Sequence, residues 1–349
     1  METVLDEVGK LYDHDKGGML KSLRSFPQGL REGSEASEAL EVCLKRRYNA
    51  FVIAGMGSSA IGGQILSDWL LGDSPIPILV SREYHLPGFV DEKTLLIAVS
   101  YSGNTEETLS ALEEGLRRGC QVVTITSGGV MERLSAERGI PMVKLPGGMQ
   151  PRASLPWQLS AIIKLAWRMG LSQSVGDEWE EALGVIDTLR NELAPETPTR
   201  LNRAKEAALA LKGTIPFIFG PRIFEGIAYR FRTQLNENSK VPASSGSFPE
   251  GFHNAVMIRE GVEELRRPLS LVLIRDPEGE GRLERKVDAF KSLLERRVSR
   301  IVEITASGRG KLSRILSVLY VCDYASVYLG LLYGLDPSST DSIKTLKGL

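Results

Sequence analysis

Two loops rich in small and hydroxyl-bearing residues stand out in the first half of the chain. Residues 55–63 read Gly-Met-Gly-Ser-Ser-Ala-Ile-Gly-Gly after one apolar run, and Ser100, Ser102 and Thr105 follow another. Such loops offer hydroxyls and backbone N–H groups to a phosphate. A tight turn would also explain the first loop, and helix capping by Thr105 part of the second. Capping gives no reason for the two serines, so we favour a shared phosphate site. Its candidate residues are Gly57, Ser58, Ser59, Ser100, Ser102 and Thr105.

Four side chains elsewhere could transfer a proton or stabilise charge. Glu237 lies in a run of amide and hydroxyl side chains, His253 lies in a Gly-Phe-His-Asn loop, and Arg152 precedes an expected helix. Lys347 lies close to the C-terminus. On residue type alone, each of these is a common solvated side chain.

Composition limits the function classes. The 349 residues carry 43 basic and 44 acidic side chains, a balance that argues against a broad nucleic-acid surface. Cys43, Cys120 and Cys322 are far apart, and with three histidines they form no metal-ligand spacing. The start of the chain lacks signal-peptide features, and the apolar stretch 315–335 is interrupted by Asp323. We therefore expect a cytoplasmic protein with a buried core helix, no metal and no membrane partner.

Short apolar runs alternate with amphipathic segments, which indicates βαβ units and mainly parallel sheets flanked by helices. We expect strands at 50–54, 76–81, 95–100, 122–126, 142–145, 215–219, 269–274 and 301–304. Helices are expected at 61–71, 105–118, 130–138, 155–169, 225–238, 283–296 and 312–334, and within 1–48 with a break at Phe26-Pro27. The fold class is α/β with two doubly wound domains of similar topology, at 1–150 and 151–349.

The motifs together resemble a known family. GMGSSAIGG with SYSGNTEETL is similar to the sugar-isomerase (SIS) domain, which binds phosphosugars. With Pro151-Arg152, residues 236–240 and Phe252-His253-Asn254 in the same order, the chain resembles the bifunctional phosphoglucose/phosphomannose isomerases of archaea and bacteria. The resemblance implies two SIS domains and a phosphosugar substrate. It also implies cofactor-free interconversion of glucose, mannose and fructose 6-phosphates through a cis-enediol.

The resemblance also implies residue roles. Glu237 would be the base, Arg152 would stabilise the enediolate, and His253 would open the sugar ring from the neighbouring subunit of a homodimer with shared sites. Lys347 would fold over the sugar with Thr340 seven residues earlier, a separation that favours Lys347 over Lys344. Ser58 and Gly251-Phe252 depart from the commoner family pattern.

Two other functions remain open. One is a non-catalytic phosphosugar sensor, which would have no need for Glu237, His253, Arg152 and Lys347 together. The other is an SIS isomerase of a different sugar phosphate, such as an amino sugar, against which the lack of an amidotransferase domain counts.

Overall fold

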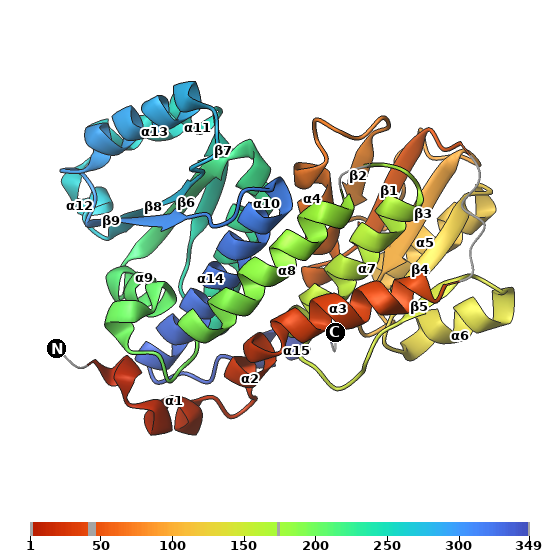
Figure 1. Ribbon diagram of the computed structural model, residues 1–349, viewed down its shortest axis with the longest axis horizontal. Helices are drawn as coiled ribbons and strands as arrows, with labels where there is room; N and C mark the ends of the chain where they lie inside the picture. The colour runs from red at the N-terminus through yellow and green to blue at the C-terminus, as the bar shows by residue number, and fades with distance from the viewer. Residues whose placement is uncertain (1–2, 41–46, 173–174, 348–349) are drawn as a thin grey trace. The chain divides into compact units, whose positions relative to one another are not determined.

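A computed structural model describes residues 3–40, 47–172 and 175–347 (Figure 1). The chain forms two compact units, here called the first unit (Ser25–Asp177) and the second unit (Met1–Arg24 with Glu178–Leu349). These bounds differ from the 150/151 division expected from sequence. Helices α3 (Phe26–Glu38) and α7 (Leu155–Arg168) pack against each other, and α7 packs on α4 (Ser58–Trp69), so this unit extends beyond residue 150.

The first unit contains a parallel five-stranded sheet of order β2-β1-β3-β4-β5. Its strands are β1 (Ala50–Gly55), β2 (Ile78–Ser81), β3 (Thr94–Val99), β4 (Gln121–Thr126) and β5 (Met142–Lys144). Its remaining helices are α5 (Glu106–Arg117), α6 (Gly129–Arg138) and the 3₁₀ turn η2 (Pro151–Ser154). The prediction of five parallel strands is confirmed, but only the three central strands β1, β3 and β4 are buried almost throughout, whereas the edge strands β2 and β5 are partly exposed. The expected break at Phe26-Pro27 is present: α2 (Met19–Arg24) ends just before it and α3 begins at Phe26, where proline is accepted in the first turn.

Strand alternation decides which helices cover each face of this sheet. Val52, Leu96 and Ala98 form a cluster with Leu112 of α5 and Met131 of α6. The opposite face packs against α4. A Cβ added to Gly63 of this helix would lie 2.9 Å from the Ile53 side chain of β1, so the helix lies close against the strand. Both faces are therefore covered, as continuous apolar strands require.

The second unit has a parallel sheet of order β7-β6-β8-β9. Its strands are β6 (Ile215–Pro221), β7 (Ser244–Phe248), β8 (Leu269–Arg275) and β9 (Arg300–Thr305). The order matches that of β2-β1-β3-β4, which confirms the expected similarity of topology. Sequence reasoning missed β7 because its Ser-Ser-Gly-Ser stretch, at the sheet edge, lacks apolar alternation.

The second unit contains both long helices and short helical turns. Its α-helices are α1 (Val8–His14), α2 (Met19–Arg24), α8 (Val175–Glu192, beginning in the first unit), α9 (Arg203–Leu211), α10 (Glu225–Gln234), α11 (Gly251–Asn254), α12 (Glu263–Arg266), α13 (Gly281–Leu294), α14 (Lys311–Leu332) and α15 (Asp341–Lys347). Its other helical turns are η1 (Val4–Asp6), η3 (Thr199–Leu201), η4 (Arg222–Phe224), η5 (Leu235–Ser239) and η6 (Ala255–Glu260).

Helix α14 is the core of the second unit. It is long and apolar enough to cross a membrane by length and composition, but 94% of its most apolar window is buried inside the protein. It packs against α2, α9 and α10. The expected buried core helix is confirmed.

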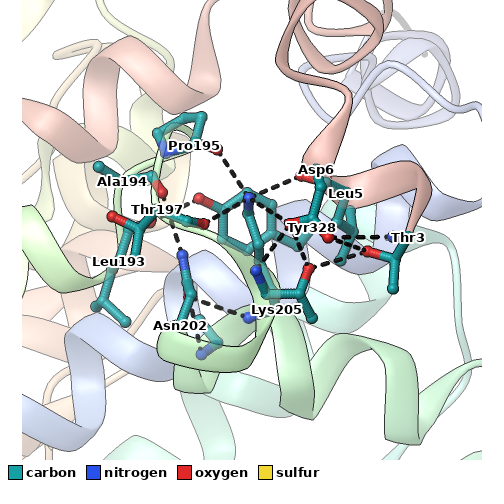
Figure 2. A network of polar contacts seen from close by, with 12 residues as sticks. Thr3, Leu5, Asp6, Leu193, Ala194, Pro195, Thr197, Asn202, Lys205 and Tyr328 are labelled. Carbon is teal, nitrogen blue, oxygen red and sulfur yellow. Dashed lines mark hydrogen bonds and ion pairs between the residues drawn. The ribbon is translucent and has the colours of Figure 1, made fainter. Parts of the chain in front are cut away.

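A fully buried lysine, Lys205, joins the N-terminal segment to the rest of the second unit (Figure 2). The Lys205 Nζ donates to the carbonyl oxygens of Leu5 and Pro195, both at 2.7 Å, and of Thr197 at 2.9 Å. Burial lowers the pKa of Lys205, and the nearby Asp6 carboxylate opposes this effect. The three carbonyls supply the acceptors that a buried ammonium requires.

Asp6 completes this network. Its Oδ1 accepts hydrogen bonds from the Thr199 amide (2.7 Å) and hydroxyl (2.8 Å), and lies 3.8 Å from the Lys205 Nζ. Burial by itself raises the pKa of Asp6, but hydrogen bonds from Thr3 and Thr199 and the charge of Lys205 outweigh it and lower the value to about 2. The folded state therefore favours the ionised carboxylate.

We expect Asp6→Asn to lower the free energy of unfolding at pH 7 by about 2 kcal/mol, the equivalent of this pKa shift. Because the folded-state pKa is depressed, the contribution is complete above about pH 4 and is lost as pH falls towards 2. Urea unfolding of both proteins at pH 7 and pH 3 measures it, with the exposed Asp13→Asn as control. An equal difference at both pH values would contradict the assignment.

Candidate active site

The two hydroxyl-rich loops begin at paired strand ends. Gly55 of β1 and Val99 of β3 are register partners, so the segments that follow leave the same edge of the sheet side by side. A Cβ on Gly55 would lie 3.0 Å from the Val99 carbonyl oxygen. The first loop therefore passes close against β3, and the expected juxtaposition of the loops is present.

The first loop opens helix α4. Gly57 is its N-cap, with a positive φ of 53° that favours glycine, and Ser59 is buried in its first turn. The Ser58 hydroxyl donates to the Pro151 carbonyl at 2.9 Å. Ser58 thus ties the loop to η2, which carries Arg152.

The second loop gathers its hydroxyls around a tight turn. The buried Ser100 Oγ accepts a hydrogen bond from the Gly103 amide at 3.1 Å and lies 2.9 Å from the Thr105 Oγ1. Ser102 is exposed, and its Oγ accepts from the Asn104 amide at 3.3 Å. Thr105 is the N-cap of α5 but makes no side-chain capping hydrogen bond, so the capping explanation is wrong. Ser102 is thus the exposed hydroxyl of this loop, whereas the Ser100 and Thr105 hydroxyls are hydrogen-bonded to each other.

A third loop, between β4 and α6, supports the second. A Cβ on Gly103 (φ 69°) would lie 1.7 Å from the Gly128 carbonyl oxygen, and one on Gly129 (φ 76°) would lie 2.3 Å from the Ser102 carbonyl oxygen. The Asn104 side chain accepts from the Val130 amide at 3.0 Å. Sequence reasoning missed this contact, although the Gly-Gly pair after an expected strand was its signal.

Arg152 is buried in η2 beside the first loop. Tyr101 holds the segment that precedes it: its hydroxyl donates to the Pro146 carbonyl at 3.0 Å and accepts from the Met149 amide at 2.9 Å. Sequence reasoning also missed Tyr101, which lies between two candidate serines. Within the first unit, the structure thus groups the hydroxyl loops and the Arg152 segment.

In the second unit, Glu237 lies on a π-helical turn, η5, at the end of α10. Such turns occur frequently at functional sites. The end of α10 is held to α14 by a buried pair, in which Arg230 Nε and Nη2 donate to the two Asp323 oxygens at 2.8 and 2.7 Å. Burial raises the pKa of Asp323, and pairing with Arg230 opposes this. Asn238, next to Glu237, donates to the Ser326 hydroxyl of α14 at 2.8 Å.

Lys240 connects this turn to the C-terminal tail. It adopts a left-handed conformation with φ 57°, and its Nζ donates to the carbonyl oxygens of Glu237 at 2.6 Å and Ser339 at 3.0 Å. Thr340 therefore follows directly after a residue anchored on the Glu237 turn. Sequence reasoning quoted Lys240 within a motif but gave it no role.

Helix α15 follows Thr340 and ends at Lys347. The side chains of Lys344 and Lys347 lie outside the described residues, so the structure does not choose between them.

His253 is exposed on the short helix α11. The preceding Phe252 ring stacks on the buried Phe248 ring with centroids 4.3 Å apart. A Cβ on Gly251 would lie 3.0 Å from the ring of Phe219. The Gly251-Phe252 pair that departs from the family pattern therefore packs the loop against the sheet and leaves His253 facing outwards.

The first unit thus groups hydroxyls with a guanidinium, and the second unit carries a carboxylate on a π-helical turn and an exposed imidazole. Among the residues described, no group of three or more His, Cys, Asp or Glu side chains is placed to hold a metal ion. Cys120 and Cys322 are free thiols, and Cys43 lies outside the described residues.

The chain is similar to proteins of a known enzyme family. Residues 200–349 match the family model "Bacterial phospho-glucose isomerase C-terminal SIS domain". A bifunctional phosphoglucose/phosphomannose isomerase of Caldicellulosiruptor bescii is 36% identical over 331 residues, 94% of this chain and 98% of that protein. One from Aquifex aeolicus is 36% identical over 86% of this chain and 90% of its own length.

A solved structure shows the same fold. Tagatose-6-phosphate ketose/aldose isomerase from Escherichia coli superimposes with a TM-score of 0.70 at 16% identity, covering 93% of this chain and 95% of that chain. The expected pair of mainly parallel SIS-type sheets is confirmed by this likeness and by the strand orders. Given the identity to relatives over nearly its whole length, the chain belongs to the bifunctional phosphoglucose/phosphomannose isomerase family.

Proposed function

We propose that this chain interconverts glucose 6-phosphate and mannose 6-phosphate with fructose 6-phosphate. The observation that carries the proposal is its 36% identity to a bifunctional isomerase over 94% of the chain. The hydroxyl loops at the edge of the first sheet support a phosphosugar substrate, because they offer hydroxyls and two helix N-termini to a phosphate.

Ser59, Ser102 and Thr105 bind the phosphate in this proposal, with the Gly57 turn admitting close backbone approach. Ser58 and Ser100 shape the two loops: the Ser58 hydroxyl donates to Pro151, and the buried Ser100 hydroxyl accepts from the Gly103 amide. Thr105 can accept a hydrogen bond from Ser100 and donate its own hydroxyl proton to the phosphate. The phosphate is common to all three substrates and does not take part in the reaction. Its binding positions C1 and C2 of the sugar.

The chemical step moves one proton between C1 and C2 and a second proton between the oxygens O1 and O2. Glu237 takes the proton from one carbon, which leaves a cis-enediolate, and returns it to the other. The Arg152 guanidinium stabilises the negative oxygen of this intermediate. His253 and Lys347 assist opening of the ring, and Thr340 leaves room for either arrangement at C2. No electrons leave the substrate, so the reaction needs no redox cofactor.

The proposed active form is a homodimer in the cytoplasm, in which His253 acts in the partner's site. The exposed position of His253 supports this proposal. So do Met257, Val262 and Leu265 in the following segment, which are 54%, 62% and 69% exposed. Large apolar side chains this exposed favour burial against another protein surface.

The two alternatives make different predictions. A phosphosugar sensor would bind fructose 6-phosphate without converting it, and an isomerase of an amino-sugar phosphate would convert that substrate faster. Coupled assays with glucose, mannose and glucosamine 6-phosphates distinguish the three functions.

We expect Glu237→Gln to lower kcat by about 10²–10⁴-fold, because the amide keeps the shape but cannot accept the proton. Calorimetry should show fructose 6-phosphate binding nearly unchanged. The control is Glu206→Gln, on the exposed side of α9. A kcat above about a tenth of wild type would exclude Glu237 as the base.

We expect Ser102→Ala to raise KM for glucose, mannose and fructose 6-phosphates by the same factor. Loss of a hydrogen bond to a charged oxygen costs about 1.5–3 kcal/mol, or about 10–100-fold. Ser110→Ala, on the following helix, serves as control. Factors that differ strongly between the sugars would mean that this loop contacts the sugar instead.

Shared sites can be tested by mixing two inactive variants. We expect Glu237→Gln and His253→Ala to be nearly inactive alone. After random pairing in a closed two-fold dimer, about half of the dimers are mixed, and each holds one intact site. Activity should return to about a quarter of wild type. Verified mixed dimers without activity would place His253 in its own subunit's site or outside the chemistry.

A further inference from the structure

The second unit has a hollow at the place that corresponds to the phosphate loops of the first. In both sheets the second strand in the order, β1 or β6, lies beside the third, β3 or β8. The crevice beyond the carboxyl ends of such a strand pair is where open α/β sheets bind ligands. Beyond β6 and β8 lies a cavity of about 540 Å³, here called the β6/β8 pocket. This volume is sufficient for a small metabolite.

Among the described residues, five cationic side chains line the β6/β8 pocket, more than the three acidic ones. They come from the β6 end and from two helices: Arg222, Arg282, Lys286, Lys311 and Arg314. Glu225 pairs with Arg222 at 3.0 Å, and a Lys286–Phe252 ring contact spans 6.0 Å. Arg282 and Lys286 are exposed on successive turns of α13, which places two positive charges at one wall.

Arg314 is the buried member of this group, with 6% of its surface exposed. Its Nη1 lies 3.2 Å from the Asp276 Oδ1, which lines the same pocket. Its Nε is buried without a hydrogen-bond partner in the described part of the chain. This N–H is out of solvent reach, so it is the rest of the guanidinium group that places a fixed positive charge at the wall of the pocket, where it attracts an oxyanion.

Three acidic side chains also line the pocket and restrict the ligand. Asp276 forms an ion pair with Arg314. Burial raises the pKa of Asp276, and the charge of Arg314 opposes this. Glu278 and Glu280 are exposed, and Glu280 is the N-cap of α13 without a side-chain capping bond. Carboxylates repel a bare polyanion but accept hydrogen bonds from hydroxyls. The mixture suits a ligand with one anionic group and several hydroxyls.

We propose that the β6/β8 pocket is a second binding site for a sugar phosphate, with its phosphoryl group held by Arg314, Arg282 and Lys286 and its hydroxyls by Glu278 and Glu280. The site lies wholly within the second unit and includes none of the proposed catalytic residues. It would exist whether the chain is an isomerase or a sensor.

Equilibrium dialysis with radiolabelled fructose 6-phosphate tests the stoichiometry. We expect about two molecules per wild-type chain at saturation, and about one in Arg282→Ala/Lys286→Ala, because each lost charged hydrogen bond weakens binding about tenfold or more. Arg285→Ala is the matched control, since Arg285 is also exposed on α13 but does not line the pocket. Hydrogen exchange should show ligand-dependent protection of residues 276–286 in wild type and in Arg285→Ala, but not in the double variant.

One molecule per wild-type chain at up to about 20 mM ligand, far above ordinary metabolite affinities, would overturn the proposal. Two molecules in the double variant would also overturn it. A second dialysis experiment uses inorganic phosphate in place of fructose 6-phosphate and compares the two affinities. Weaker binding of phosphate than of fructose 6-phosphate at this site supports a sugar phosphate, whereas equal binding would overturn the roles given to Glu278 and Glu280. Both alanine substitutions are at exposed positions, so the double variant is expected to fold.

Discussion

Adjacent parallel strands end at the same edge of a sheet, and the arrangement of the hydroxyl loops and of the β6/β8 pocket depends on that constraint. Because Gly55 and Val99 are register partners, two loops that are about 45 residues apart in sequence begin side by side. The sheet alone therefore brings the serine and threonine hydroxyls of two separate segments to the same edge, and no further element is needed to do so. The same geometry in β6 and β8 forms the cavity of the second unit.

The position of Glu237 depends on polar contacts with a buried helix. In α14, Asp323 accepts hydrogen bonds from Arg230 of α10, before the turn that carries Glu237, and Ser326 accepts one from Asn238 within that turn. A Cβ on Gly330 would lie 2.5 Å from the Asn238 carbonyl oxygen, so the helix approaches the turn closely. Removing one partner of such a buried ion pair costs about 3–5 kcal/mol, which makes the pair a strong constraint on geometry.

The two units use different chemistry at equivalent strand ends. The first presents neutral hydroxyls and glycines, side chains that carry no charge and allow a ligand to approach the backbone closely. The second presents guanidinium and ammonium groups with carboxylates between them. Arginine and lysine act over longer distances and need less exact backbone geometry than hydroxyls. A cationic pocket therefore needs no Gly-rich turn, and short-motif reasoning overlooked it.

The sequence by itself determined the fold class, most strands and the candidate phosphate residues, because apolar periodicity and Gly/Ser loops are local signals. It did not determine β7, whose Ser-Ser-Gly-Ser stretch becomes a strand only by pairing with β6. The roles of Tyr101 and Lys240 were equally out of reach, since their carbonyl partners are set by how the chain returns on itself. Tertiary structure alone decided which hydroxyls form hydrogen bonds within the protein and which cationic side chains line the β6/β8 pocket. Such partners are distant in sequence, and no local pattern encodes them.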